Sequence, residues 1–104
     1  FIIIECIRLA SYYYPEYRFS YIKTKDHAEL ELVVERPGKP LLCIKIKSSD
    51  NVREDKLYSF IRLVKDLENS EAICISQDPR AKKIGDIMVL PWMAALRKYF
   101  IPET

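Results

Sequence analysis

The sequence predicts an α/β protein of the α+β kind, in which helices flank a mixed central sheet of about four to five strands. Several early segments alternate between apolar and polar residues, as half-buried strands do, whereas others repeat apolar residues at helical spacing. The run Glu71 to Ser76 (EAICIS) is nearly continuously apolar, which is typical of a strand covered on both faces. The expected order of elements is α-βββ-α-β-β-α.

Length and composition predict one domain with its own core. The chain has 104 residues, of which 49% are hydrophobic and 31% are charged, and its net charge of +2 is too mild to predict nucleic-acid or membrane binding by itself. No repeat or internal linker divides residues 1–104, and no apolar run approaches the ~20 residues of a membrane span. The chain opens on Phe1 to Ile4 without an initiator Met or a helix cap, so we expect a piece of a longer polypeptide.

The cysteines and the single histidine predict neither disulfides nor zinc. Cys6, Cys43 and Cys74 stand far apart, each inside an apolar run. An odd number without paired spacing favours free, buried thiols in a reducing cytoplasm. His27 has no cysteine at ligand spacing, so no zinc site is expected.

The first half of the chain is predicted to hold one helix and three strands. Residues 2–14 repeat apolar side chains at helical spacing, and Pro15 ends that helix. Residues 17–23, 28–36 and 41–50 alternate in polarity, which predicts strands. The Pro-Gly loop at residues 36–40 joins the last two strands into a hairpin.

The second half is predicted to hold two helices and two short strands. Asp50 or Asn51 caps a helix over residues 52–67, and the strands cover residues 71–76 and 87–90. A basic loop at residues 80–83 separates these strands. Pro91 is expected to start the last helix.

The predicted hairpin brings opposite charges together. Counting inward from the loop, Glu31 pairs with Lys45 and Glu29 pairs with Lys47. Residues paired in this way have Cβ atoms about 4.5–5.5 Å apart. They are either ordinary ion pairs on a solvated face, worth about 0–1 kcal/mol each, or a patch for an anion, or an active-site strand with altered chemistry.

A series of motifs resembles the PD-(D/E)XK, or restriction-endonuclease-like, fold. It runs through Glu5 in the opening helix, Thr24-Lys25-Asp26, AELELV at residues 28–33, IKIKSS at residues 44–49, and Asp78-Pro79 through Leu90-Pro91-Trp92. These motifs are most similar to the domain of unknown function found C-terminal to the P-loop module in prokaryotic AAA-type ATPases. The resemblance covers nearly the whole chain. It implies a cytoplasmic protein whose partner is the N-terminal P-loop ATPase domain of the same chain, with ATP bound in that parent chain.

The resemblance also implies a site. Active members of the wider fold hold a divalent metal with acids on neighbouring strands, and a lysine two residues after the second acid assists the attacking water. By position, Glu31 is the first acid, Lys45 replaces the second acid, Lys47 is the lysine and Glu5 is the helix glutamate. Two unit charges about 4 Å apart interact by roughly 4 kcal/mol at an effective dielectric near 20. Lys45 is therefore expected to neutralise Glu31 and repel Mg²⁺, leaving an inactive domain without a metal or other cofactor.

Three functions follow from these observations. The first is a non-catalytic accessory domain of the ATPase that contacts a protein or a nucleic acid. The second is a Mg²⁺-dependent nuclease that uses Glu5, Glu31 and Lys47. The third is a nucleic-acid-binding module that does not cleave, in which phosphates are bound by the two hairpin lysines together with Lys23, Lys25, Arg80, Lys82 and Lys83. These lysines are equally explained as solubilising residues. The alternating Tyr17, Phe19 and Tyr21 predict core packing rather than base stacking.

Overall fold

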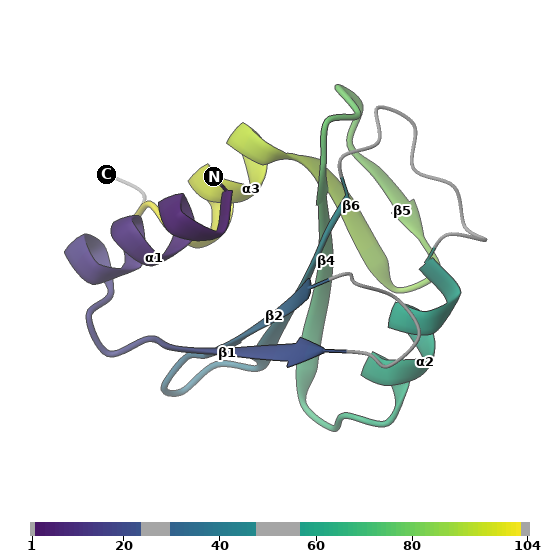
Figure 1. Ribbon diagram of the computed structural model, residues 1–104, viewed down its shortest axis with the longest axis horizontal. Helices are drawn as coiled ribbons and strands as arrows, with labels where there is room; N and C mark the ends of the chain where they lie inside the picture. Colours follow the sequence, from purple (N-terminus) through teal and green to yellow (C-terminus); the bar gives the residue numbers. More distant parts are fainter. Residues whose placement is uncertain (1, 24–29, 48–56, 103–104) are drawn as a thin grey trace.

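The structure, a computed structural model, describes residues 2–23, 30–47 and 57–102 (Figure 1). One sheet runs through the molecule, with α1 and α3 together on one side of it and α2 on the other. In chain order the elements are α1 (Ile2–Tyr13), β1 (Arg18–Lys23), β2 (Leu30–Glu35), β3 (Leu41–Ile46), α2 (Tyr58–Lys65), β4 (Ser70–Ser76), β5 (Lys82–Ile84), β6 (Ile87–Pro91) and α3 (Trp92–Tyr99).

The sheet is mixed and has the strand order β1-β2-β3-β4-β6-β5. Strands β1, β2 and β3 pair antiparallel, β3, β4 and β6 pair parallel, and β5 returns antiparallel to β6. The predicted α+β class with a mixed sheet is therefore confirmed. The carboxyl ends of β1, β3, β4 and β6 lie at one edge of this sheet, which we call the carboxyl edge.

The residues that the structure describes already form a sheet of six strands, so the predicted count of four to five is wrong. The additional strand is β5, which covers part of the segment expected to be a basic loop. Ile84 pairs with Ile87, and this leaves Gly85-Asp86 as a two-residue turn with a φ of +60° at Gly85. Glycine at the first central position is typical of a type II′ hairpin turn. The observed order is α-βββ-α-βββ-α.

Alternation along the strands divides the core into two layers. In β3, Leu42 and Ile44 face α1 and α3, whereas Cys43 faces α2. The layer under α1 and α3 also contains Cys6, Ala10 and Phe100, and the layer under α2 contains Leu57, Phe60, Cys74, Ile87 and Val89. The apolar stripe of each helix is thus buried against one face of the sheet.

The core confirms most of the packing expected from the sequence. Cys6, Cys43 and Cys74 are buried thiols and are not joined by disulfide bonds. Tyr17 and Phe19 pack against the layer under α1 and α3, and the ring of Phe19 stacks on Phe100 with centroids 6.2 Å apart. Tyr21 departs from the prediction, because 53% of its surface is exposed. It lies near the end of the edge strand β1.

Most of the described elements start and end close to their predicted limits, but the strand expected over residues 41–50 ends at Ile46, and residues 48–50 lie outside the described residues. The helix expected over residues 52–67 ends at Lys65, and Asp66 is its C-cap. Its predicted start and the Asp50 or Asn51 cap lie outside the described residues, as do Ala28, Glu29 and His27. Among the helices of the described segments, none combines the length and the apolar character needed to span a membrane.

Candidate functional site

Several charged and polar residues lie together at the carboxyl edge. Strand β3 carries Lys45 and is followed by Lys47, and strand β4 ends at Ser76, two residues before Asp78. Strand β6 ends at Pro91, and Trp92 follows at once as the first residue of α3. Because β3, β4 and β6 are parallel, their ends meet here, the edge at which open α/β sheets usually bind ligands.

Lys45 is buried within the sheet face that α2 covers. The backbone register pairs it with Glu31 on β2, as the hairpin predicted, and with Cys74 on β4. Only 3% of its surface is exposed. An ammonium group so far removed from water needs polar partners, so Lys45 is a structural part of the fold rather than a solubilising residue. The interpretation of this face as solvated is wrong at Lys45.

Lys47 extends the β3–β4 ladder by one residue at the carboxyl edge. Its backbone N–H donates to the carbonyl oxygen of Ile75 at 2.9 Å. This bond belongs to the last pair of the β3–β4 ladder, in which Ile46 pairs with Ile75. The side chain of Lys47 is partly exposed. Glu29, the predicted partner of Lys47, lies outside the described residues.

Asp78 organises the turn that follows β4. Its backbone N–H donates to Oγ of Ser76 at 3.1 Å, and its Oδ1 accepts the backbone N–H of Arg80 at 3.0 Å. Its Oδ2 forms an ion pair with Nζ of Lys82 at 3.0 Å, and the carboxylate is fully buried. The Arg80 N–H, then Lys82, hold the pKa of Asp78 below its usual value. Sequence reasoning did not select Asp78 as a site residue, although Asp before Pro in a polar turn is a known signal for this geometry.

The predicted phosphate-binding group is only partly assembled. Lys82 and Lys83 lie on the edge strand β5, and the charge of Lys82 is paired with Asp78. Arg80 extends outward with 79% of its side chain exposed, and its Nε lies 3.8 Å from Asp78 Oδ1. Lys23 ends β1 at the same edge, and Lys25 lies outside the described residues. Lysines on an edge strand also discourage pairing with other chains, which gives Lys83 a structural explanation.

Glu5 is placed apart from Lys45. It lies on α1, which covers the opposite face of the sheet. Its carboxylate accepts two hydrogen bonds from the guanidinium group of Arg8, from Nε at 3.2 Å and from Nη2 at 2.9 Å. The bond from Arg8 lowers the pKa of Glu5. The described contacts thus explain Glu5 as one member of a helix-surface ion pair at i, i+3 spacing.

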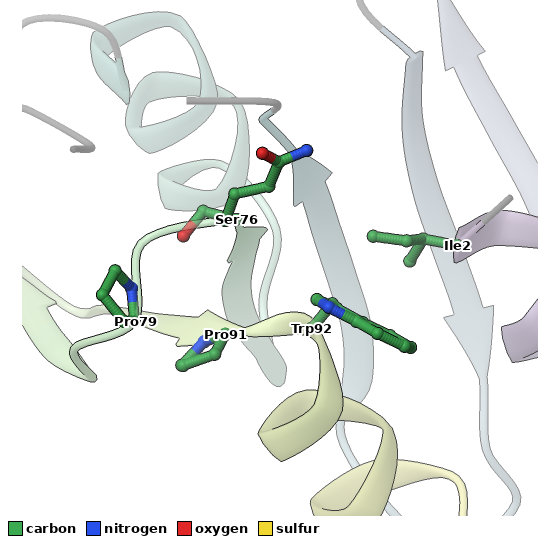
Figure 2. A pocket seen from close by; sticks show the side chains of 6 residues that line it. Ile2, Ser76, Pro79, Pro91 and Trp92 are labelled. Carbon is green, nitrogen blue, oxygen red and sulfur yellow. The ribbon is translucent and has the colours of Figure 1, made fainter. Parts of the chain in front are cut away.

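A cavity of about 640 Å³ opens at the carboxyl edge, and we call it the edge cavity (Figure 2). Ile2 of α1 and Trp92 of α3 lie on one side of it, and Pro79 and Pro91 lie on another. Ser76 and Gln77 contribute its polar lining. Sequence reasoning missed this cavity, because its walls come from both ends of the chain.

A metal centre is not evident in the part of the chain that the structure describes. There, no three His, Cys, Asp or Glu side chains lie close enough together to hold an ion. Asp78 is the buried carboxylate at the carboxyl edge, and its oxygens are directed at Arg80 and Lys82. The Asp78 carboxylate is therefore arranged for internal ion pairs.

Comparison with known proteins places the chain in one family. Neither the curated proteins nor the solved structures give a significant match. The model of the family described as "Domain of unknown function (DUF4143)" matches residues 1–95. This match spans far more than half of the chain, so the protein belongs to the DUF4143 family.

Proposed function

We propose that this protein is a non-catalytic, nuclease-like accessory domain of a P-loop ATPase, and that it acts by contacting a protein or a nucleic acid. The proposal rests on Lys45. This residue stands at the second metal-ligand position of the PD-(D/E)XK pattern, pairs in register with Glu31 and is 3% exposed. A strand built for metal-dependent cleavage needs a carboxylate at that position.

Electrostatics explain why Lys45 opposes metal binding. Mg²⁺ binds oxygen ligands and keeps much of its water, so it needs a negatively charged and accessible site. A cation about 4 Å away repels each unit of its charge by roughly 4 kcal/mol at an effective dielectric near 20. Because Lys45 is held inside the sheet, its side chain cannot swing into solvent to relieve that repulsion. The same burial supports a role for Lys45 in maintaining the scaffold.

A metal titration with a restored acid tests the loss of catalysis. Calorimetric titration with Mn²⁺ is expected to give no site-specific binding to the natural protein at millimolar concentration. Lys45→Glu recreates an acid two residues before Lys47 and is expected to gain Mn²⁺ affinity. Lys45→Gln is the matched control, since it removes the charge without adding a ligand.

A cleavage assay tests the alternative of a Mg²⁺-dependent nuclease. Plasmid and single-stranded DNA are incubated with Mg²⁺ or Mn²⁺, and the natural protein is compared with Glu31→Ala. We expect no cleavage by either protein. Metal-dependent cleavage that Glu31→Ala abolishes would show that the domain is an active nuclease and would overturn the proposal.

The link to an ATPase is tested by the complete reading frame that encodes this domain. A P-loop ATPase carries G-x-x-x-x-G-K-[ST], in which backbone N–H groups and the lysine bind the phosphates. We expect this motif upstream of the domain. A complete reading frame without it would remove the ATPase from the proposal and leave only the contact role.

A further inference from the structure

We propose that the edge cavity is a binding site for one nucleotide unit, that is, a planar nucleobase carrying a phosphate. This inference goes beyond the proposed function, because it needs neither the ATPase nor the nuclease-like ancestry of the fold. It joins three observations, namely the position of the cavity, the chemistry of its walls and the charges at its rim.

The position and size of the edge cavity fit a small ligand. It lies beyond the carboxyl ends of β4 and β6, where open α/β sheets bind ligands. Its volume of about 640 Å³ falls within the ~300–1,000 Å³ that is usual for ligand pockets. Its walls are anchored in the fold, since Ile2 and Trp92 pack against the hydrophobic layer under α1 and α3.

The walls of the edge cavity suit a flat, largely apolar ring. Trp92 supplies an indole, and indole rings stack on all nucleobases because every base has a π face. Pro79 and Pro91 add rigid walls that lack backbone N–H donors. Gln77 is exposed at the cavity, and its side-chain amide offers both donors and an acceptor to the polar edge of a base.

The charges around the edge cavity favour an anionic ligand. Arg80 directly follows the lining residue Pro79, and 79% of its side chain is exposed, with its Nε 3.8 Å from Asp78 Oδ1. The nearby carboxylate of Asp78 is buried and paired with Lys82. Asp78 thus lies against two basic side chains, Arg80 and Lys82, so the local charge is positive, and the phosphate of a base stacked on Trp92 would pair with Arg80. An uncharged proline-rich peptide carries no anion for Arg80.

Fluorescence of Trp92 tests the site directly. It is the only tryptophan of the chain, so quenching by a ligand reports on this cavity alone. We expect AMP to quench the emission and to bind about tenfold more tightly than adenosine, because only AMP engages Arg80 through a charge-assisted bond. Inorganic phosphate should leave the emission unchanged, and N-acetyltryptophanamide corrects for absorption by the nucleotides.

Two further probes distinguish the source of the nucleotide. A short single-stranded oligodeoxyadenylate that binds much more tightly than AMP, with an affinity that falls steeply with salt, would assign the site to a nucleic-acid strand. Equal affinity would assign it to a free nucleotide. Failure of both AMP and the oligonucleotide to bind at millimolar concentration overturns the proposal, and so does quenching by a proline-rich peptide alone.

Variants locate the bound nucleotide. Binding of fluorescently labelled AMP, measured by anisotropy, is expected to weaken about tenfold or more in Trp92→Leu, the loss expected from one aromatic–base stack. Gln77→Ala and Arg80→Ala change exposed side chains and should leave the fold intact. These two variants therefore test nucleotide binding even if Trp92→Leu fails to fold. Arg62→Ala, an exposed arginine on α2, is the matched control for charge. Equal binding by all of these variants places the nucleotide elsewhere and rejects the proposal.

Discussion

The Tyr99 hydroxyl group donates a hydrogen bond to Oε2 of Glu71 and so ties the last helix to the start of β4. The other carboxylate oxygen of Glu71 accepts a bond from Nη2 of Arg36 at 3.2 Å. Nε and Nη2 of Arg36 also donate to the carbonyl oxygen of Pro40, at 3.1 and 2.7 Å. Burial alone would raise the pKa of Glu71, but the bonds from Tyr99 and Arg36 outweigh it and lower that pKa. Three distant segments are thereby joined at the edge of the sheet opposite the carboxyl edge.

Removal of the Tyr99 hydroxyl group should weaken this junction. Tyr99→Phe keeps the buried ring and loses one bond to a charged acceptor, so we expect the free energy of unfolding to fall by about 1–2 kcal/mol. Urea denaturation measures the change. Tyr12→Phe alters an exposed tyrosine and is the control. Equal stability of the two variants would show that the bond contributes nothing.

The depressed pKa of Asp78 should make the fold sensitive to acid. Its pKa lies below the usual 3.8 in the folded chain, so near that pH the unfolded chain binds more protons. The stabilisation is complete above the unfolded pKa and is lost as the pH falls through the folded pKa. Asp78→Asn should lower stability at neutral pH and flatten its decline in acid, as measured by thermal unfolding at a series of pH values. Glu68→Gln, an exposed acid, serves for comparison. An unchanged acid profile in Asp78→Asn would contradict the assignment.

The turn between β5 and β6 should depend on the backbone of Gly85. Its φ is +60°, and a Cβ added there would meet no atom within 4 Å. The cost of Gly85→Ala is therefore conformational, and we expect about 1 kcal/mol. Asn tolerates this region of φ better, so Gly85→Asn should cost less. Amide hydrogen exchange of β5 and β6 checks whether the loss is local, and a larger cost for Asn than for Ala would refute this explanation.

The buried thiols should resist modification in the folded state. Cys6, Cys43 and Cys74 are each at most 2% exposed, and burial raises the pKa of Cys6 to about 12. The thiolate is the reactive form, so a disulfide reagent at about pH 8 should label none of them until urea unfolds the chain. Ser11→Cys on the exposed side of α1 should react at once and is the positive control. Rapid labelling of the natural protein would show that the core opens readily.

Much of the secondary structure follows from local patterns in the sequence. The period of two in β1, β2 and β3 and the helical spacing of α1 each reflect burial of one face of a single element. The register that pairs Glu31 with Lys45 followed from the loop at residues 36–40, because the side-chain alternation of a hairpin is fixed by its turn. Strand β5 was not predicted from the sequence, because two of its three residues are lysines and were assigned to a basic loop. The Gly-Asp turn that follows β5 was a signal for a hairpin at this place.

By itself, the sequence determined most of the helices and strands, the burial of the cysteines and the pairing of positions 31 and 45, because each depends on local period or on one short loop. Only the tertiary structure decided that Lys45 is buried, that Asp78 forms an ion pair with Lys82, and that Ile2 and Trp92 line the same cavity. It also decided that Tyr99 reaches Glu71 across 28 residues of chain. Such contacts join segments whose separation leaves no periodic trace, so they form only when the layers of the fold pack together.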